Sequence, residues 1–127
     1  VGEGMTVLIT GDMSFSYDVN GLSSTYLSPR FKIIVMCNGG GGIFRFIKPT
    51  SDLPELETCF EIHRDISVEK YADLFGLRYF ELNDEKSAAE VLSLFFAEED
   101  RPAILAVHTP NVYNAEVLRG YFRRSRQ

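Results

Sequence analysis

The sequence predicts an α/β protein, a three-layer α/β/α sandwich on a mainly parallel sheet. Short runs of apolar and β-branched residues alternate along the chain with segments of helical spacing, and this alternation is typical of parallel α/β folds. The runs are apolar throughout, as expected for strands that are buried on both faces. The first strand, helix and strand together have the length of one βαβ unit, whose connection is right-handed.

The first third of the chain is expected to form this βαβ unit. Residues 5–10 (MTVLIT) are a nearly continuous apolar run and are predicted to be a strand, which the following glycine and aspartate break. Apolar side chains then recur at near-helical spacing over 17–27, and Pro29 ends this helix because the residue before a proline disfavours the helical conformation. Residues 31–37 (FKIIVMC) are predicted to be the second strand.

The middle of the chain contains a long loop, a helix and a strand. Residues 48–65 lack a clean period and include two prolines, so we expect a loop with at most a short helical turn. Residues 67–76 are expected to be a helix, because Ser67 suits its N-cap and Gly76 its C-cap. Residues 77–83 are predicted to be a strand.

The last third of the chain is expected to add a helix, a strand and a final helix. Residues 84–99 carry an amphipathic stripe, 102–109 are another apolar run, and 114–126 have helical spacing. The predicted order is therefore β-α-β-loop-α-β-α-β-α, with the whole chain, residues 1–127, as a single domain.

Composition excludes several classes of protein. With 45% hydrophobic and 24% charged residues, the chain of 127 residues has the composition of a globular domain. The net charge of −5 argues against nucleic-acid binding, and the basic C-terminal cluster is expected to be the solvated end of a helix. No apolar run reaches the roughly 18 residues of a membrane span, and no signal-peptide pattern is present.

The two cysteines, Cys37 and Cys59, have no CxxC spacing. We expect both to be reduced thiols in a cytoplasmic protein. The chain enters a strand-like run almost at its first residue, which suggests that it is a piece of a longer protein.

Four consecutive glycines, residues 39–42, follow the second predicted strand. Alone, such a run indicates either a flexible surface loop or a backbone cradle for a phosphate group. Its position favours the cradle, because ligands of open parallel sheets bind outside the carboxyl ends of the strands.

Asp12 and Asn38 follow the first and second predicted strands. Their carboxylate and amide oxygens, with a backbone carbonyl from the glycine turn, are suitable ligands for Mg²⁺, which usually completes its shell with phosphates and water. The chain has neither the GxGxxG fingerprint nor the GxxxxGK[ST] P-loop, so a dinucleotide or nucleoside triphosphate site lacks motif support.

Two stretches carry a resemblance to a known family: GDMSFSYDVNGL (11–22) and NGGGGIF (38–44). They resemble the thiamin diphosphate motif, whose usual form is GDG…NN. Within that superfamily the chain is similar to the 2-succinyl-5-enolpyruvyl-6-hydroxy-3-cyclohexene-1-carboxylate synthases of menaquinone biosynthesis. Cys37 and Gly39 depart from the pattern, because the family usually has asparagines there.

The resemblance implies a thiamin diphosphate-binding fold and a set of site residues. The implied ligands of Mg²⁺ or Mn²⁺ are Asp12, Asn38 and the backbone oxygen of Gly40. The implied thiamin diphosphate contacts are Gly11, Asp12, Met13, Ser14, Asn38, Gly40, Gly41, Gly42 and Ile43. The positions that match apolar residues of the substrate pocket are Ile43, Phe44 and Ile47.

The resemblance also implies what the whole protein does. It would decarboxylate 2-oxoglutarate and add the resulting succinyl carbanion to isochorismate. The chain would be most of the C-terminal pyrophosphate-binding domain, with the pyrimidine and central domains absent, so its expected partners are those domains and a second subunit in a homodimer or dimer of dimers. The glutamate that activates the cofactor belongs to the partner's pyrimidine domain, so this fragment has no catalytic residue and is expected to be inactive alone.

Two other functions are left open by the residues. One is the pyrophosphate domain of another thiamin diphosphate carboligase or 2-oxo acid decarboxylase, and the other is a non-catalytic phosphate- or nucleotide-binding module on a Rossmann-like sheet.

Several charged residues and histidines are not assigned to the site by the motifs. Arg45 is expected to be exposed, either in solvent or against an anionic substrate. The remaining residues are expected to be solvated charges or structural histidines: Glu55, Glu57, Glu61, His63 and His108.

Overall fold

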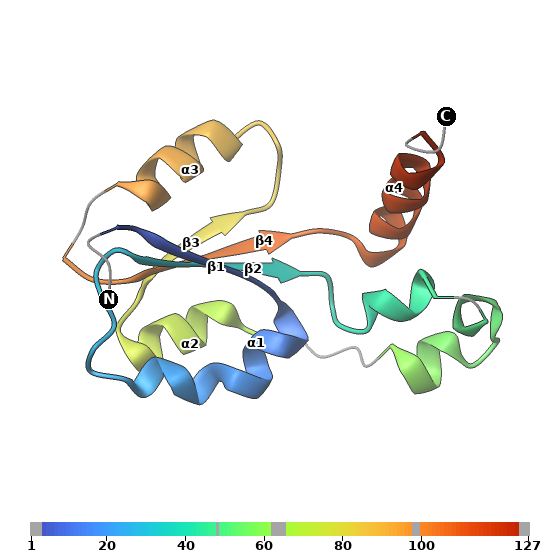
Figure 1. Ribbon diagram of the computed structural model, residues 1–127, viewed down its shortest axis with the longest axis horizontal. Helices are drawn as coiled ribbons and strands as arrows, with labels where there is room; N and C mark the ends of the chain where they lie inside the picture. Colours follow the sequence, from blue (N-terminus) through green and yellow to red (C-terminus); the bar gives the residue numbers. More distant parts are fainter. Residues whose placement is uncertain (1–3, 48, 62–65, 98–99, 125–127) are drawn as a thin grey trace. The chain divides into compact units, whose positions relative to one another are not determined.

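The computed structural model describes residues 4–47, 49–61, 66–97 and 100–124, and its elements alternate as the sequence predicts (Figure 1). Here η1, η2 and η3 are 3₁₀ helices, and η4 is a single π-helical turn. The elements are, in chain order, β1 (Thr6–Gly11), α1 (Asp12–Asp18), η1 (Val19–Ser23), β2 (Phe31–Cys37), η2 (Gly42–Arg45), η3 (Thr50–Asp52), η4 (Leu56–Phe60), α2 (Val68–Phe75), β3 (Arg78–Leu82), α3 (Ala88–Phe96), β4 (Ala103–His108) and α4 (Asn111–Arg124).

The chain divides into two compact units. Unit 1 consists of Val1–Cys37 and Ile66–His108, and it contains the sheet with α1, α2 and α3. Unit 2 consists of Asn38–Asp65 and Thr109–Gln127, and it contains η2, η3, η4 and α4.

The sheet of unit 1 has four strands in the order β1-β2-β4-β3, and all of its pairings are parallel. This confirms the predicted parallel sheet. Near the carboxyl edge, Gly11 of β1 is paired with Met36 of β2, and Cys37 of β2 is paired with His108 of β4. The residues that follow these positions therefore leave the sheet at one edge.

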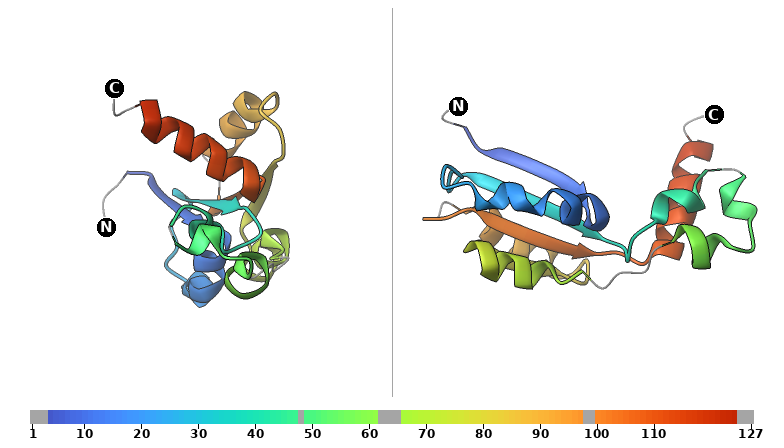
Figure 2. Two further views of the ribbon diagram at one scale, coloured as in Figure 1. Left: turned by 90° about the vertical axis from the view of Figure 1, so that its right-hand side faces the viewer. Right: turned by 90° about the horizontal axis from the view of Figure 1, so that it is seen from below.

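One face of the sheet is covered by α1 and α2, which lie side by side along it (Figure 2, right). Phe15 of α1 and the fully buried Ala72 of α2 pack into a cluster with β2 and β4 residues such as Ile33 and Ile104. The periodic apolar residues of both helices thus form the main core of the unit.

The opposite face is covered by α3, where Phe95 is fully buried against Ala103 and Leu105. Lys32 of β2 is also buried on this side; its Nζ donates to the carbonyl of Ala97 just after α3 (3.2 Å) and lies 5.9 Å from the centre of the Phe95 ring. Helices on both faces make unit 1 the predicted three-layer sandwich (Figure 1).

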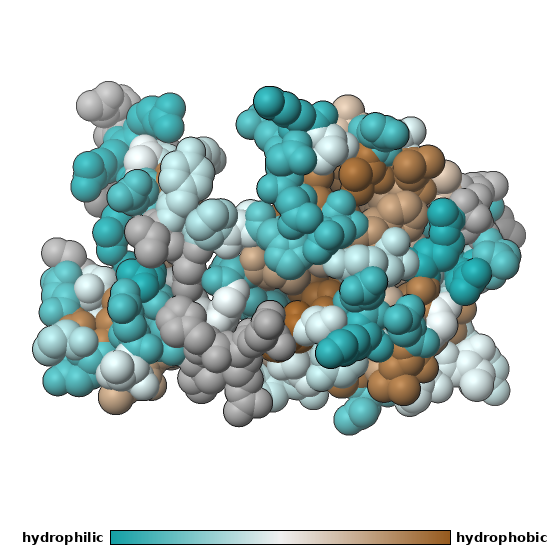
Figure 3. Space-filling model, turned by 180° about the vertical axis from the view of Figure 1, so that it is seen from behind, coloured by the Kyte–Doolittle hydropathy of each residue, from teal (hydrophilic) through white to brown (hydrophobic). Residues whose placement is uncertain are grey.

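Much apolar surface remains exposed on unit 1. Within the described part of the chain no strand pairs with the outer edge of β1, where Ile9 keeps 67% of its surface exposed. Apolar side chains of α2 and α3, including Leu74 and Leu94, are exposed too. Figure 3 shows such patches among hydrophilic residues on one face. Among the described residues, no helix has the length and apolar character needed to cross a bilayer.

Unit 2 combines the helix α4 with short helical turns, and some of its apolar residues are buried. The Thr50 hydroxyl donates to the carbonyl of Ile47 (2.6 Å), and the rings of Phe44 and Phe60 lie 5.5 Å apart. Leu56 of η4 is buried. The loop expected over 48–65 therefore contains two short helical turns in its described part.

The prediction of the first helix over 17–27 was wrong at both ends. The chain enters α1 directly at Asp12, because Gly11 is extended (φ −83°, ψ 160°) and serves as its N-cap. An acidic residue in the first turn suits the helix dipole. No helix extends beyond Ser23, and Tyr26 is 94% exposed.

The predicted start of the helix over 84–99 was four residues too early. The Asp84 carboxylate accepts the amides of Lys86 (2.8 Å) and Ser87 (3.0 Å), so these residues form a turn instead. Helix α3 begins only at Ala88.

Candidate functional site

Asp12 lies at the carboxyl edge of the unit 1 sheet, in the first turn of α1. It is only 5% exposed, and its Oδ1 accepts the amide of Met13 at 2.8 Å. The sequence places it there because β1 ends in glycine and the helix starts at once. A carboxylate in this position is the hard oxygen ligand that Mg²⁺ prefers.

The next residues expected to contact a diphosphate are placed in the same turn of α1. The Met13 carbonyl accepts the hydroxyl of Ser16 (2.8 Å). Ser14 is exposed and lines a cavity of about 290 Å³ together with apolar residues of β1 and β2, among them Leu8 and Ile33. The expected contact of Ser14 with a diphosphate stays a prediction.

The glycine turn lies in unit 2, immediately after β2. Gly39, Gly40 and Gly41 have φ of 85°, 86° and 67°, values at which other residues are strained. The Asn38 Oδ1 accepts the amide of Gly40 at 3.1 Å and closes the start of the turn. Left-handed backbone therefore favours glycine at the first three positions of the run.

Gly41 is also required for close packing. A Cβ added to it would lie 2.6 Å from the Cα of Glu61 and 2.9 Å from the carbonyl oxygen of Phe60. The backbone that approaches Gly41 most closely therefore belongs to the chain itself, at the end of η4.

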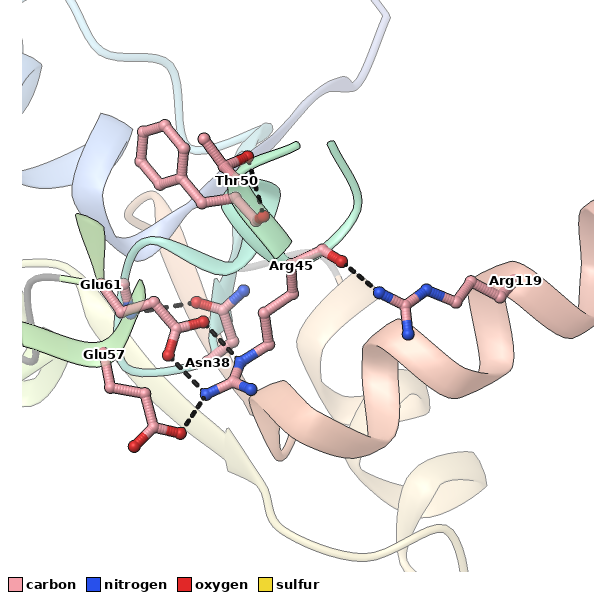
Figure 4. A network of polar contacts seen from close by, with 8 residues as sticks. Asn38, Arg45, Thr50, Glu57, Glu61 and Arg119 are labelled. Atoms are coloured by element: carbon pink, nitrogen blue, oxygen red, sulfur yellow. Dashed lines mark hydrogen bonds and ion pairs between the residues drawn. The ribbon is translucent and has the colours of Figure 1, made fainter. Parts of the chain in front are cut away.

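Arg45 and Glu61 form a buried ion pair in unit 2, shown in Figure 4. The Arg45 Nε lies 2.5 Å from Glu61 Oε1, and its Nη2 donates to Glu61 Oε2 (2.6 Å) and to Glu57 Oε1 (3.0 Å). The hydrogen bonds to Glu61 and then to Glu57 raise the pKa of Arg45, which stays charged. The expectations of a solvated Glu61 and an exposed Arg45 were wrong, because their side chains are 0% and 17% exposed.

The expected substrate-pocket residues lie on and beside η2. Ile43 and Ile47 are 60% and 47% exposed, whereas Phe44 is half-buried against Phe60. Two exposed apolar side chains beside the glycine turn are available to a ligand or to another part of the protein.

A second polar group at the carboxyl edge of unit 1 was not singled out from the sequence. Glu81 Oε1 accepts the Tyr79 hydroxyl (3.2 Å) and lies 3.1 Å from His108 Nε2. Burial, followed by the charges of Asp12 and Glu81, raises the pKa of Cys37 to about 11. Burial and Glu81 also raise the pKa of Tyr79. The only signal in the sequence that could have indicated the position of Glu81 is the alternation of side chains along β3. His63, which was expected to be a structural histidine, lies outside the described residues.

The residues at the two strand ends fit a diphosphate and its metal ion by the chemistry of their donors. Asp12 offers a carboxylate oxygen and Asn38 an amide oxygen, both hard donors of the kind that Mg²⁺ prefers. Asp12 belongs to unit 1, whereas Asn38 and Gly40 belong to unit 2. Their meeting at one ion therefore stays a prediction. Among the described residues, no group of three or more His, Cys, Asp or Glu side chains could hold a metal.

Known proteins match this chain over almost its entire length, although no protein-family model does. The chain is 48% identical over 122 residues to the 2-succinyl-5-enolpyruvyl-6-hydroxy-3-cyclohexene-1-carboxylate synthase of Porphyromonas gingivalis. It is 40% identical over 124 residues to the synthase of the same name from Flavobacterium johnsoniae, and 36% identical over 120 residues to that of Christiangramia forsetii.

The chain belongs to this synthase family. The three matches cover 96%, 97% and 94% of the chain but only 21%, 22% and 21% of the respective relatives. The chain thus spans about one fifth of the length of the synthases that it matches, as expected for a fragment.

Proposed function

We propose that this chain is the pyrophosphate-binding part of a synthase that uses thiamin diphosphate and Mg²⁺ or Mn²⁺. The proposed reaction decarboxylates 2-oxoglutarate and adds the succinyl unit to isochorismate, a step of menaquinone biosynthesis. The observation that carries the proposal is the identity of 36–48% with synthases of this name, in matches that cover 94–97% of the chain.

Three groups of the chain would hold the metal ion. They are the carboxylate of Asp12, the amide oxygen of Asn38 and the backbone oxygen of Gly40. A buried carboxylate provides the negative charge, and the two neutral oxygens leave ligand positions for the diphosphate and water. The ion would neutralise the diphosphate and so fix the cofactor at the sheet edge.

The backbone around the glycine turn would hold the diphosphate. Residues with left-handed φ turn their amides toward one side of the chain, and such concave backbone segments suit anions. Gly41, Gly42 and Ile43 start η2, so their amides lie before the first hydrogen bond within that helix, which Phe44 donates to Gly41 (3.0 Å).

When bound, thiamin diphosphate supplies a carbon nucleophile that attacks the 2-oxo group and stabilises the negative charge left after CO₂ departs. The side chains of Ile43 and Ile47 would exclude water from the substrate side of the site. The residues that activate the cofactor and grip the substrate carboxylates would come from the missing domains and from a second subunit.

Calorimetric titration of the full-length protein with thiamin diphosphate and Mg²⁺ tests the proposal. The wild type is expected to bind, and Asp12→Ala and Asp12→Asn are each expected to weaken binding at least about tenfold, a loss of roughly 1.4 kcal/mol. Asp18→Ala is the matched control, because Asp18 ends the same helix and is exposed.

If both Asp12 variants bind thiamin diphosphate and Mg²⁺ as tightly as the wild type, Asp12 is not a metal ligand. Formation of the adduct from 2-oxoglutarate and isochorismate distinguishes this synthase from another carboligase, which would prefer a different acceptor. A protein that binds phosphate or nucleotides without turning over any 2-oxo acid would instead be a binding module.

A further inference from the structure

Glu61 is a charged residue in a place where charge is unfavourable. Its side chain is fully buried at the end of η4, and its amide donates to the carbonyl of Leu56 at 2.9 Å. A buried carboxylate is retained only when a partner compensates for its lost hydration. The structure of unit 2 shows such a partner.

Arg45 is this partner, and it approaches Glu61 with two nitrogens. The contacts of 2.5 Å from Nε and 2.6 Å from Nη2 form the two-pronged arrangement that arginine makes with carboxylates. Arg45 is the last residue of η2, the helix that follows the glycine turn. The pair therefore ties the end of η4 to the far end of η2.

A second contact ties Glu61 to the near end of η2. The Glu61 backbone lies where a Cβ of Gly41 would be, and Gly41 is the left-handed N-cap of that helix. Helix α4 adds a further tie, because Arg119 Nη2 donates to the backbone oxygen of Arg45 at 2.5 Å (Figure 4). Both ends of η2 are thus fixed by groups outside it.

We propose that Glu61 is a positioning residue that holds the glycine turn ready for the diphosphate, through its ion pair with Arg45 and its backbone contact with Gly41. The inference rests on the function proposed above, which assigns the turn to the cofactor. Glu61 itself does not touch the ligand. A turn already held in its binding conformation loses less entropy on binding, so releasing it weakens affinity.

The test compares Glu61→Gln with Glu57→Gln in the full-length synthase. Both variants remove one carboxylate that pairs with Arg45, but Glu57 is 68% exposed and serves as the matched control. We expect Glu61→Gln to raise the Kd for thiamin diphosphate with Mg²⁺ about tenfold and to speed amide exchange at Gly39–Gly42 by a similar factor. Glu57→Gln is expected to change both by less than about twofold.

Turnover separates positioning from a direct catalytic role. At saturating cofactor the kcat of Glu61→Gln is expected to stay within about twofold of wild type, because only the affinity depends on the turn. Arg45→Lys keeps the charge and loses the two-pronged contact, so it provides a second variant if Glu61→Gln does not fold. Exchange protection of Ile33 and Leu105 in the unit 1 core reports whether each variant is folded.

Failure of this inference can be told apart from failure of the proposed function. If Glu61→Gln binds the cofactor like wild type while Asp12→Ala does not, the positioning role is overturned and the function stands. If the wild type does not bind the cofactor, the function fails. In that case equal exchange rates at Gly39–Gly42 in wild type and Glu61→Gln overturn the positioning role as well.

Discussion

Gly41 and Gly76 have almost the same φ, 67° and 68°, yet they are glycines for different reasons. At Gly76, the C-cap of α2, an added Cβ would meet nothing within 4 Å, so only backbone conformation requires glycine there. At Gly41 the added Cβ would overlap Glu61 as well. The sequence pattern indicates the C-cap role of Gly76 but not the contact between Gly41 and Glu61.

Replacing each glycine by alanine should therefore have unequal effects. Gly76→Ala should cost about 1 kcal/mol of local stability, from the left-handed conformation alone. Gly41→Ala should cost at least roughly 1 kcal/mol more, because backbone at Glu61 must move. Native-state hydrogen exchange in the full-length protein measures both values. Equal costs would mean that the contact with Glu61 does not constrain the turn.

The two cysteines should differ in reactivity. Because burial and nearby carboxylates raise the pKa of Cys37 from 9.0 to about 11, only about one thiol in a thousand is ionised near pH 8. Cys59 is exposed. Iodoacetamide should therefore label Cys59 first in metal-free protein, as followed by mass spectrometry of the peptides. Faster labelling of Cys37 would contradict the raised pKa.

The same shift determines how Cys37 affects stability at alkaline pH. The folded state binds the thiol proton more tightly than the unfolded state, so its contribution is complete below about pH 9 and is lost as pH rises toward about 11. A Cys37→Ser variant should lose less stability over that interval than wild type.

At the scale of elements, β1 is a strand of the sheet whose apolar side chains remain largely exposed. It pairs with β2 on one side, whereas Val7, Leu8 and Ile9 remain 42%, 44% and 67% exposed. An apolar strand with a free edge can pair with other chains. The apolar residues that predict a buried strand over 5–10 are thus partly exposed to solvent in this chain.

Ile9→Lys should reduce self-association of the isolated chain. A lysine on an edge strand opposes strand pairing between molecules. Leu74→Lys is the matched control, since Leu74 is 72% exposed but lies on helix α2. Analytical ultracentrifugation measures the difference, and an equal gain from both variants would point to general solubility instead of the edge.

At the scale of the whole molecule, the proposed function assigns residues of both compact units to one cofactor. Asp12 comes from unit 1, and the glycine turn comes from unit 2. The chain accounts for about one fifth of the synthases that it matches. The proposed function therefore depends on groups from both units and from other domains of a full-length synthase.

The isolated chain should bind thiamin diphosphate far more weakly than the full-length protein. In the proposed site its donors would hold only the diphosphate and metal, and the rest of the cofactor would be bound by other domains, so a loss of at least about a hundredfold in affinity is expected. Parallel calorimetric titrations measure the ratio. Tight binding and turnover by the 127-residue chain would overturn the proposal that it is part of a larger enzyme.

The strand positions could be predicted because a strand buried on both faces is mostly apolar, as β2 and β4 are apart from Lys32 and His108. The boundaries of α1 and α3 could not, since they depend on where the backbone turns: Gly11 leads straight into α1, and Asp84 binds two amides before α3. The positions of Asp12 and Asn38 after two strands of a parallel sheet were predictable from the apolar runs that precede them, and their role in a site stays a prediction. The burial of Glu61 and its ion pair with Arg45 could not be predicted.

By itself the sequence determined the parallel α/β class, the family and the residues that follow the strands, because each is encoded by local pattern or by close resemblance to relatives. Tertiary structure alone decided which charges are buried. Arg45 and Glu61 are 16 residues apart, and no local pattern links them. They meet because η2 and η4 pack against each other. The Glu61 carboxylate is buried there, and the Arg45 guanidinium compensates for its lost hydration.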